Sequence, residues 1–508
     1  VLYQIFPDRF ARSTHAAPPP EGLRFHQDWH ELPDYTPATD SQDNQAADFF
    51  GGNLDGIREK LPYLQSLGVT ALYLNPIFQA HTNHRYDTCD YRQIDPLLGD
   101  TPAFTALCQA ASKHGIRVLL DGVFSHTGRD SRYFQDACHN PTSAYARWYT
   151  FTHWPDAYDC WWGIPTLPNV RELDPSYLDF QLRAPDATVR TWLQAGASGW
   201  RLDVADELPV PFLQTLRTAV KQTAPDAAII GEVWEDASNK ITYGKSRSYC
   251  LGDTLDSVMN YPLRSALIAF LTRTSDAPHV KRQLDALYDR YPRPFSYALM
   301  NLLSSHDQPR ILNTLAGFDG ASLSRTEQRH LTLSAAQRAV GLVRLRVMLR
   351  IICALPGMPC LYYGDEAGMT GGPDPYCRQT FPWDTPDHAL QDEVSMLFHL
   401  RRHCLPLTSG TLLLLSPDAH TLVLVRRIRN GLDALGESAP NGCAICVARS
   451  TAEETPVCID AALTGVSTLY DERNQPHVAQ DGLFSLPIPP SGCLYRSTLH
   501  KKQAANHS

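Results

Sequence analysis

Eight short apolar segments, separated by helix-like stretches, set the limits on how this chain can fold. Their apolar residues run on without regular alternation, which is typical of strands that are buried on both faces. Such strands alternating with helices predict a parallel sheet, and eight of them predict a closed α/β barrel, the TIM (β/α)8 fold. The predicted strands are Leu2–Phe6, Val69–Phe78, Ile116–Phe124, Gly199–Val204, Ala228–Val233, Leu255–Tyr261, Ala298–Ser304 and Pro359–Tyr363.

Two helical patterns lie between these strands. In the segment Asn53–Leu67, leucine and isoleucine recur every three or four residues, with Asn53 as the expected N-cap and Gly68 as the stop. Pro62 lies inside this segment and should bend or stagger the helix. A similar apolar stripe over Leu178–Leu193 predicts one further helix.

Changes in the pattern of the chain predict three domains. The barrel should comprise residues 1–126 and 175–404. Residues 127–174 are rich in Trp, Tyr, Pro and Asp and are too long for an ordinary βα loop, so they predict a subdomain inserted after strand 3. Short alternating runs in residues 405–500 predict a C-terminal antiparallel β-sandwich, and the polar residues 501–508 predict a disordered tail.

The composition suits a globular protein with a neutral ligand. Lys and Arg number 45 against 54 Asp and Glu, which gives a formal net charge of −9. Proteins that bind nucleic acid or anionic membranes favour basic patches, so we expect neither nucleic acid nor membrane as a partner. No apolar run approaches the roughly 18 residues of a membrane span.

The 13 cysteines are spread along the chain and predict free thiols. Cys443 and Cys446 have CxxC spacing, but no second pair or histidine cluster accompanies them, so we expect no zinc site. Reduced, mostly buried thiols favour a cytoplasmic protein.

Charged and polar residues gather where four of the predicted strands end. These ends are Asp121–His126 (DGVFSH), Gly199–Asp203 (GWRLD), Gly231–Trp234 (GEVW) and Ser305–Asp307 (SHD). In a barrel of this kind the active groups lie at the carboxyl ends of the strands, so these side chains should meet.

Two of these carboxylates suit glycoside hydrolysis. Arg201 and Asp203 point the same way on a strand, and a carboxylate beside an arginine stays ionised, which suits a nucleophile. Glu232 comes from the next strand and would serve as the acid, and two carboxyl groups about 5 Å apart would define a retaining glycosidase. The alternative is a set of ion pairs that stabilise the barrel rim; it is disfavoured because buried charges without a role are costly.

The same segments resemble the α-amylase family, glycoside hydrolase family thirteen, whose members share a barrel, an inserted subdomain and a C-terminal sandwich. GWRLDV is similar to the branch of neopullulanases, cyclomaltodextrinases and maltodextrin glucosidases, and VLYQIFPDRFA and DPYCRQTFPW resemble maltodextrin glucosidases most. The family's conserved regions are matched by residues 121–126, 199–207, 231–234 and 304–307, and its strand-eight signature by residues 357–366.

The resemblance implies a role for each matched residue. Asp203 matches the nucleophile, Glu232 the general acid and base, and Asp307 a third carboxylate that grips sugar hydroxyls and helps keep Glu232 protonated. The residues expected to bind substrate are Tyr86 as an aromatic platform, His126, Arg201 and His306 as donors, Asp374 and Arg378 at the terminal ring, and Trp234 on the leaving-group side. The alternatives are a core filler for Tyr86, a surface ion pair for Asp374 and Arg378, and an ordinary buried tryptophan for Trp234.

Some positions depart from the family pattern. Ser125 stands where most amylases have the asparagine that ligates calcium, and the segment Pro7–Thr14 lacks an acidic calcium-binding run, so we expect no metal and no other cofactor. Asp206 and Glu207 replace the Lys-His pair of amylases, which implies different leaving-group subsites. Relatives usually carry an N-terminal sandwich domain that lies outside these 508 residues, and a homodimer through such a domain is an expectation.

The expected function is a retaining hydrolase of α-1,4, and some α-1,6, glucosidic bonds in oligosaccharides such as maltodextrins or cyclodextrins. A glucosyl transferase of the same family would keep the same three carboxylates and is the first alternative. A non-catalytic relative that binds carbohydrate or protein is the second, and it is disfavoured because Asp203, Glu232 and Asp307 are all present.

Overall fold

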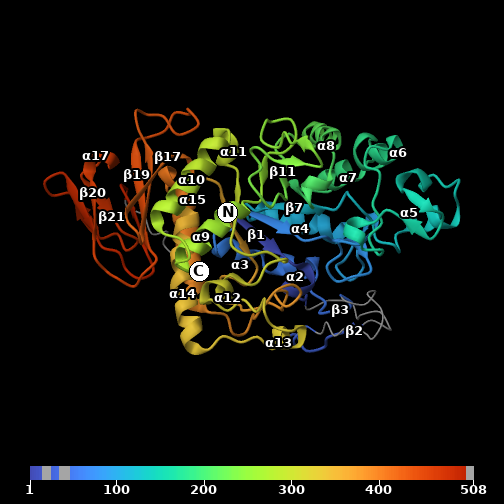
Figure 1. Cartoon of the computed structure of the whole chain (residues 1–508), viewed down its shortest axis with the longest axis horizontal. Coiled ribbons are helices and arrows are strands. Elements are labelled where there is room, and N and C mark those ends of the chain that lie inside the picture. The colour runs from blue at the N-terminus through green and yellow to red at the C-terminus, as the bar shows by residue number, and fades with distance from the viewer. Residues whose placement is uncertain (14–23, 34–45, 499–508) are drawn as a thin grey trace.

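Eight parallel strands close into a barrel in the computed structural model, which describes residues 1–13, 24–33 and 46–498 (Figure 1). Each strand lies beside the next along the chain, and β16 pairs back with β1. A parallel bridge between Met259 and Met300 joins the sixth strand to the seventh and completes the ring. The strands are β1 (Leu2–Ile5), β4 (Ala71–Leu74), β7 (Arg117–Gly122), β10 (Gly199–Leu202), β11 (Ala228–Gly231), β14 (Ser257–Val258), β15 (Met300–Leu302) and β16 (Met358–Tyr362).

The predicted barrel is confirmed, although all of its strands except β16 are shorter than the apolar segments that predicted them. The segment Val69–Phe78 contains β4 and the start of β5 (Phe78–Ala80), which pairs antiparallel with β6 (Thr88–Ile94). Only β16 begins before its predicted segment, by one residue at Met358. After β10 the chain leaves the sheet at Asp203, so polar side chains follow the strand end directly.

The two helical patterns had different outcomes. The first is confirmed as a staggered pair, α2 (Leu54–Glu59) and α3 (Leu61–Ser66), in which Asn53 caps α2 by accepting the Gly56 N–H. The prediction of one helix over Leu178–Leu193 was wrong. The chain there forms α6 (Pro175–Leu178), a π-helical segment (Asp179–Arg183) and α7 (Thr188–Gln194), because Pro185 follows an extended Ala184 and lacks the N–H that a helix needs.

Most of the remaining helices flank the barrel (Figure 1), whereas α16 (Leu405–Ser409) packs on strands of the C-terminal sheet. The longer ones are α4 (Thr101–Lys113), α8 (Val210–Thr223), α9 (Tyr261–Leu271), α10 (Ala277–Arg290), α14 (Ala335–Ala354) and α15 (His388–His403). The shorter ones are α1 (Pro7–Phe10), α11 (Arg293–Ser296), α12 (Ile311–Ala316), α13 (Arg325–Arg329) and α16.

The long connection after β7 carries its own small elements. These are α5 (Arg132–His139), the hairpin strands β8 (Phe151–His153) and β9 (Ala157–Tyr158), and single 3-10 turns at Ala146–Trp148 and Trp161–Gly163. In Figure 1 this segment extends to one end of the molecule, opposite the C-terminal strands.

The C-terminal region is antiparallel, as predicted. A six-stranded sheet in the order β17-β18-β19-β24-β21-β22 faces the pair β20-β23 across an apolar core that includes Val423, Ile445, Phe484 and Tyr495. The strands are β17 (Thr411–Asp418), β18 (Thr421–Ile428), β19 (Gly442–Arg449), β20 (Val457–Asp460), β21 (Thr468–Tyr470), β22 (Pro476–Val478), β23 (Leu483–Leu486) and β24 (Cys493–Arg496). The predicted tail, 501–508, lies outside the described residues.

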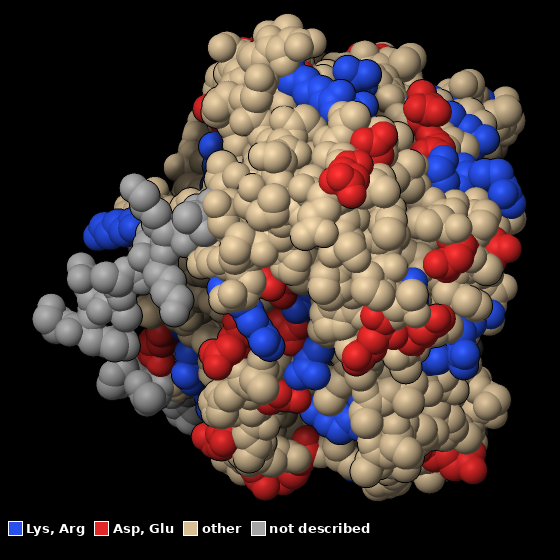
Figure 2. All heavy atoms as spheres, turned by 90° about the vertical axis from the view of Figure 1, so that its left-hand side faces the viewer, with Lys and Arg blue, Asp and Glu red and all other residues tan. Residues whose placement is uncertain are grey.

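The apolar length of the helices, the surface charge and the state of the cysteines bear on the predictions made from the composition. Within the described segments no helix is long and apolar enough to cross a membrane. The face that carries the C-terminal strands shows acidic and basic side chains interspersed over a mostly uncharged surface (Figure 2). All 13 cysteines are free thiols, and most of them are buried.

Candidate active site

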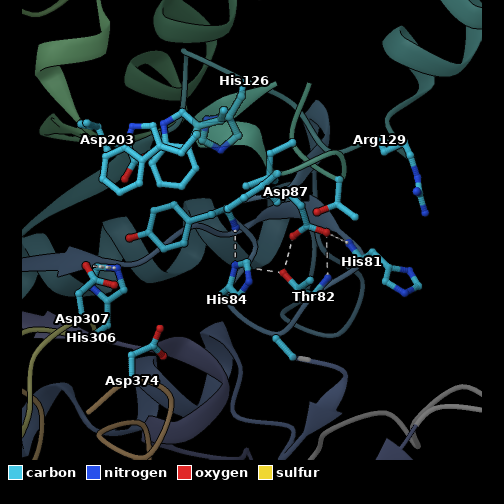
Figure 3. A pocket seen from close by; sticks show the side chains of 18 of the residues that line it. His81, Thr82, His84, Asp87, His126, Arg129, Asp203, His306, Asp307 and Asp374 are labelled. Carbon is cyan, nitrogen blue, oxygen red and sulfur yellow. Dashed lines mark hydrogen bonds and ion pairs between the residues drawn. The ribbon is translucent and has the colours of Figure 1, made fainter. Parts of the chain in front are cut away.

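A cavity of about 680 Å³ opens at the carboxyl ends of the barrel strands, where the sequence predicts the site. The cavity brings together nine of the ten predicted site residues, and the tenth, Arg201, lies directly beneath two of them. Figure 3 shows Asp203 and His126 on one side of this space and His306, Asp307 and Asp374 on another. The nine lining residues are Tyr86, His126, Asp203, Glu232, Trp234, His306, Asp307, Asp374 and Arg378.

A single buried guanidinium holds the acids together. Arg201 contacts Asp203 at 3.0 Å through one terminal nitrogen and Glu232 at 2.9 Å through the other. The first nitrogen also donates to Asp121 at 2.8 Å, below the cavity. Asp203 and Glu232 come from neighbouring strands that pair in register, so the barrel itself sets their proximity.

Burial dominates the electrostatics of this cluster. It raises the pKa of Asp203 well above its usual range; Arg201 opposes the shift, while Glu232, Asp121 and Asp307 reinforce it. Burial also raises the pKa of Glu232, and Arg201 again opposes the shift. Because the carboxyl groups outnumber the one arginine between them, the pKa of Asp203 is shifted in the direction opposite to the one that the neighbouring arginine alone would give.

The residue after Asp203 has a backbone conformation that the sequence does not suggest. Val204 has φ 34° and ψ 68°, a left-handed conformation that is rare for a β-branched residue. This turn directs the Val204 N–H to Oε2 of Glu232 at 2.9 Å. Arg201 contacts the same oxygen, so Oε1 of Glu232 is left for other partners. Strain of this kind is often found at functional sites.

Asp307 is held from the opposite side. Arg378 contacts Asp307 at 3.4 Å and Asp374 at 2.8 Å, and its Nε donates to the carbonyl oxygen of His306. The Arg378 side chain is 5% exposed and Asp374 is 47% exposed, so this is not a surface ion pair. Burial and the nearby Glu232 raise the pKa of Asp307 to about 7, although Arg378 opposes the shift.

Aromatic rings line the cavity around these charges. The Tyr86 ring stacks on His306 with centroids 5.1 Å apart and planes at 8°, and its hydroxyl donates to Asp121. Trp234 stacks on Tyr261 at 4.5 Å and is 41% exposed, so it is not an ordinary buried tryptophan. Burial lowers the pKa of His126 to about 4, so this ring is neutral at pH 7.

Sequence reasoning missed the tryptophans of the inserted segment. Trp161 and Trp162 stack at 4.3 Å and both line the cavity, and Trp162 is 69% exposed. Trp161 also packs against His126, with ring centroids 5.3 Å apart. The WW pair itself was the available signal, because a large exposed aromatic ring at a cavity rim is more often a binding surface than a core residue.

No metal site emerges from the described part of the chain. No group of three or more His, Cys, Asp or Glu side chains there is arranged to hold a metal ion. Calcium also takes backbone and amide oxygens, so the expectation that the protein needs no calcium stays a prediction.

The fold and the site together define a (β/α)8 protein with carboxylates clustered at the carboxyl ends of its strands. Residues 4–178 and 181–395 match the model of the α-amylase catalytic domain. The chain belongs to the α-amylase family, glycoside hydrolase family thirteen. The family resemblance drawn from the sequence motifs is thereby confirmed, as is the branch, since relatives named cyclomaltodextrinase and neopullulanase are among the matches.

Three relatives illustrate the likeness. An amylopullulanase from Thermoanaerobacter thermohydrosulfuricus is 38% identical over 504 residues, which cover 88% of this chain and 33% of the relative. A cyclomaltodextrinase from Geobacillus thermopakistaniensis is 35% identical over 97% of this chain and 76% of its own length. The structure of a cyclic α-maltosyl-(1→6)-maltose hydrolase from Arthrobacter globiformis is 28% identical, covers 98% of both chains and has a TM-score of 0.77. The chain thus spans about a third of the amylopullulanase and most of the other two.

Proposed function

We propose that this chain is a retaining α-glucan hydrolase that cleaves α-1,4, and some α-1,6, glucosidic bonds in maltodextrins or cyclodextrins. The observation that carries the proposal is the pair of carboxylates, Asp203 and Glu232, which contact one guanidinium and line a large cavity. The names of the relatives, which include cyclomaltodextrinase and neopullulanase, support the substrate class.

In the first step an oxygen of Asp203 attacks the anomeric carbon and forms a glycosyl ester, while the bond from that carbon to the leaving oxygen breaks. Glu232 gives its proton to the leaving oxygen. We place this proton on Oε1, because the Val204 N–H and Arg201 both contact Oε2. In the second step Glu232 takes a proton from water, the water oxygen bonds to the anomeric carbon, and Asp203 leaves as a carboxylate.

The other cavity residues suit the binding of sugar rings. Tyr86 offers an apolar ring face beneath the reacting sugar. Asp307, braced by Arg378, would accept hydrogen bonds from its hydroxyls, and Asp374 would bind the ring at the outer edge. Trp234 would contact the leaving group from the side of Glu232. His126, which is neutral, offers its Nε2 for a hydrogen bond, whereas His306 contacts Asp307 through its own Nε2.

The test is product analysis. Maltotriose, β-cyclodextrin and pullulan are incubated separately with the enzyme, and the anomer released first is identified by proton NMR. We expect α-anomeric products, and we expect Asp203→Asn to lose several powers of ten in kcat. Asp179→Asn, at an exposed position of the π-helical segment, is the matched control. Release of the β-anomer, or substantial activity in Asp203→Asn, would refute the mechanism.

The same assay separates the alternatives. With an added acceptor sugar, a transferase gives mainly longer products, whereas a hydrolase gives mainly free sugars. A non-catalytic relative gives no product from any of the three substrates.

We propose further that catalysis needs no calcium, since Ser125 replaces the usual asparagine ligand. Prolonged chelator treatment should leave the activity and Tm unchanged, and a loss restored specifically by calcium would contradict this. A cytoplasmic location is proposed from the free thiols, and a homodimer from the resemblance; light scattering tests the second.

A further inference from the structure

We propose that Gln4 is a positioning residue that fixes the tautomer of His306, so that His306 donates a hydrogen bond to Asp307. The inference rests on the proposed hydrolase reaction and extends it to a residue of strand β1 that does not line the cavity.

Gln4 is fully buried inside the barrel. Its amide nitrogen lies 3.0 Å from Nδ1 of His306 and 3.0 Å from Oδ1 of Asn75. An amide nitrogen has two hydrogens, so both are used by these two acceptors. Asn75 directly follows β4, and His306 lies shortly after β15. The Gln4 side chain on β1 therefore contacts residues at the ends of two other barrel strands.

This contact determines which nitrogen of His306 carries the proton. Burial lowers the pKa of His306 well below its usual range, and Arg378 and Arg201 lower it further, so the ring is neutral and has a single N–H. Nδ1 accepts from Gln4, and the hydrogen must therefore be on Nε2. Nε2 lies 3.0 Å from Oδ2 of Asp307 (Figure 3). If Nδ1 carried the hydrogen instead, the lone pair of Nε2 would face a lone pair of the Asp307 carboxylate.

The second hydrogen of the Gln4 amide holds the ring that stacks on His306. Asn75 accepts from Gln4 and donates to the Tyr86 hydroxyl at 2.9 Å. Tyr86 lies parallel to the His306 ring at 5.1 Å. Gln4 thus fixes both the protonation of the imidazole and, through Asn75, the ring that packs against its face.

The arrangement has a cost that a purely structural residue would avoid. Among the described residues no partner reaches Oε1 of Gln4, which is a buried acceptor. Flipping the amide would place this oxygen against the Asn75 oxygen, which needs a donor because the Asn75 amide nitrogen is directed at Tyr86. An apolar residue of similar size would remove the unpaired oxygen but would supply neither of the two donors that His306 and Asn75 use.

The test begins with Gln4→Met, which keeps the approximate side-chain volume and removes both donors. We expect kcat on maltotriose to fall at least about tenfold with KM changed less than about threefold, because the group misplaced is one that acts on the transition state. Gln181→Met is the matched control, since Gln181 is also a fully buried glutamine but lies on the π-helical segment outside the cavity. Both amide atoms of Gln181 are buried without a hydrogen-bond partner among the described residues, so this variant removes no donor that another group uses and should leave kcat unchanged. Equal kcat in Gln4→Met and Gln181→Met overturns the proposal.

A double-mutant cycle tests whether Gln4 acts through His306. In a His306→Asn background, Gln4→Met should cost less than about threefold in kcat, because the group that it positions is gone. Losses that multiply independently in the double variant would show that Gln4 acts through general packing and would overturn the proposal.

A third measurement does not depend on activity. In protein labelled with 15N in the imidazole rings, the signals lost in His306→Asn identify His306. They should report a hydrogen on Nε2 in the wild type and a mixture of tautomers in Gln4→Met. A wild-type ring with its hydrogen on Nδ1 refutes this inference, whereas absence of activity in a wild type with the expected tautomer refutes only the proposed hydrolase.

Discussion

Glu232 differs from Asp203 in what its oxygens contact, and this difference separates the roles of the two acids. Both contacts to Glu232 fall on Oε2, so the other oxygen can carry the proton that a leaving group needs. We predict that Glu232→Gln loses several powers of ten in kcat/KM on maltodextrins but far less in the first step on an aryl maltoside. A leaving group that departs without protonation does not need the acid. Burst kinetics on the aryl substrate measure this step, and equal losses on both substrates would contradict the assignment.

Arg378 sits where the substrate chain should end. It is buried, it bridges Asp307 and Asp374, and it would face the outer hydroxyls of a terminal sugar. We predict that Arg378→Ala weakens action on maltotriose more than on long amylose, by about 1–3 kcal/mol in transition-state stabilisation. A ring that is linked onward offers one hydroxyl fewer, so it gains less from the arginine. The measurement is kcat/KM on both substrates.

The control for this prediction is Arg183→Ala. Arg183 pairs with Asp179 four residues away at 3.8 Å, and both side chains are about half exposed. An exposed pair of this kind contributes less than about 1 kcal/mol, so neither substrate should be affected. An effect of Arg378→Ala on maltotriose that is equal to or smaller than its effect on amylose would rule out the terminal-ring role.

Residues that carry charge at strand ends could be predicted from the sequence, whereas those that orient them could not. Asp203, Glu232 and Asp307 stand out because each is an acid at the end of a short, mostly apolar segment. Gln4 and Val204 look like ordinary strand residues, and their contribution depends on one amide orientation and one left-handed φ. Such details arise from tertiary contacts that no local pattern encodes.

At the scale of elements, the strands were predictable because each is short, apolar and buried on both faces. The helices were less so: the stripe over Leu178–Leu193 has helical spacing, but Pro185 interrupts it and the chain forms a π-helical segment instead. Periodicity reports which face is buried, not whether the hydrogen bonds are continuous.

The packing of β10 against β11 sets the distance between the two catalytic candidates, and Gly199 controls that packing. It has φ +153°, and a Cβ there would lie 2.3 Å from the Ala228 carbonyl oxygen. We predict that Gly199→Ala destabilises the fold by about 2–5 kcal/mol and lowers kcat in the remaining folded protein. Thermal unfolding and kinetics at low temperature measure the two effects.

Gly115→Ala is the matched control for this prediction. Gly115 also has a positive φ, +68°, but a Cβ there would meet nothing within 4 Å. It should cost only the about 1–2 kcal/mol of a left-handed backbone and leave kcat unchanged. If both variants lose the same stability, close packing between the two strands is not what requires glycine at position 199.

For the molecule as a whole, buried histidines and buried carboxyl groups make the stability depend on pH. Burial lowers the pKa of His84 to about 3 and of His126 to about 4, so these rings favour folding as the pH rises toward 6.5. Asp307 and Glu366 act in the opposite direction, because burial raises the pKa of each to about 7. The pH dependence of stability is a sum of opposing contributions. The contribution of a single group is therefore best measured as the difference in stability between the wild type and a variant that lacks the group.

Glu366 offers that test, because it is fully buried outside the cavity, where it accepts from the hydroxyls of Tyr3 and Tyr63 at 2.6 and 2.7 Å. Its pKa rises from 4.5 in the unfolded chain to about 7. The folded protein therefore keeps a proton that the unfolded chain releases, and stability falls as the pH rises through this window. We predict that the wild type loses about 3 kcal/mol, or a few degrees in Tm, relative to Glu366→Gln between pH 4.5 and 7.5, since glutamine does not titrate. Unfolding of both proteins across this range measures the difference, with the exposed Glu454→Gln as control. A constant difference in Tm between wild type and Glu366→Gln would show that folding does not shift the pKa of Glu366.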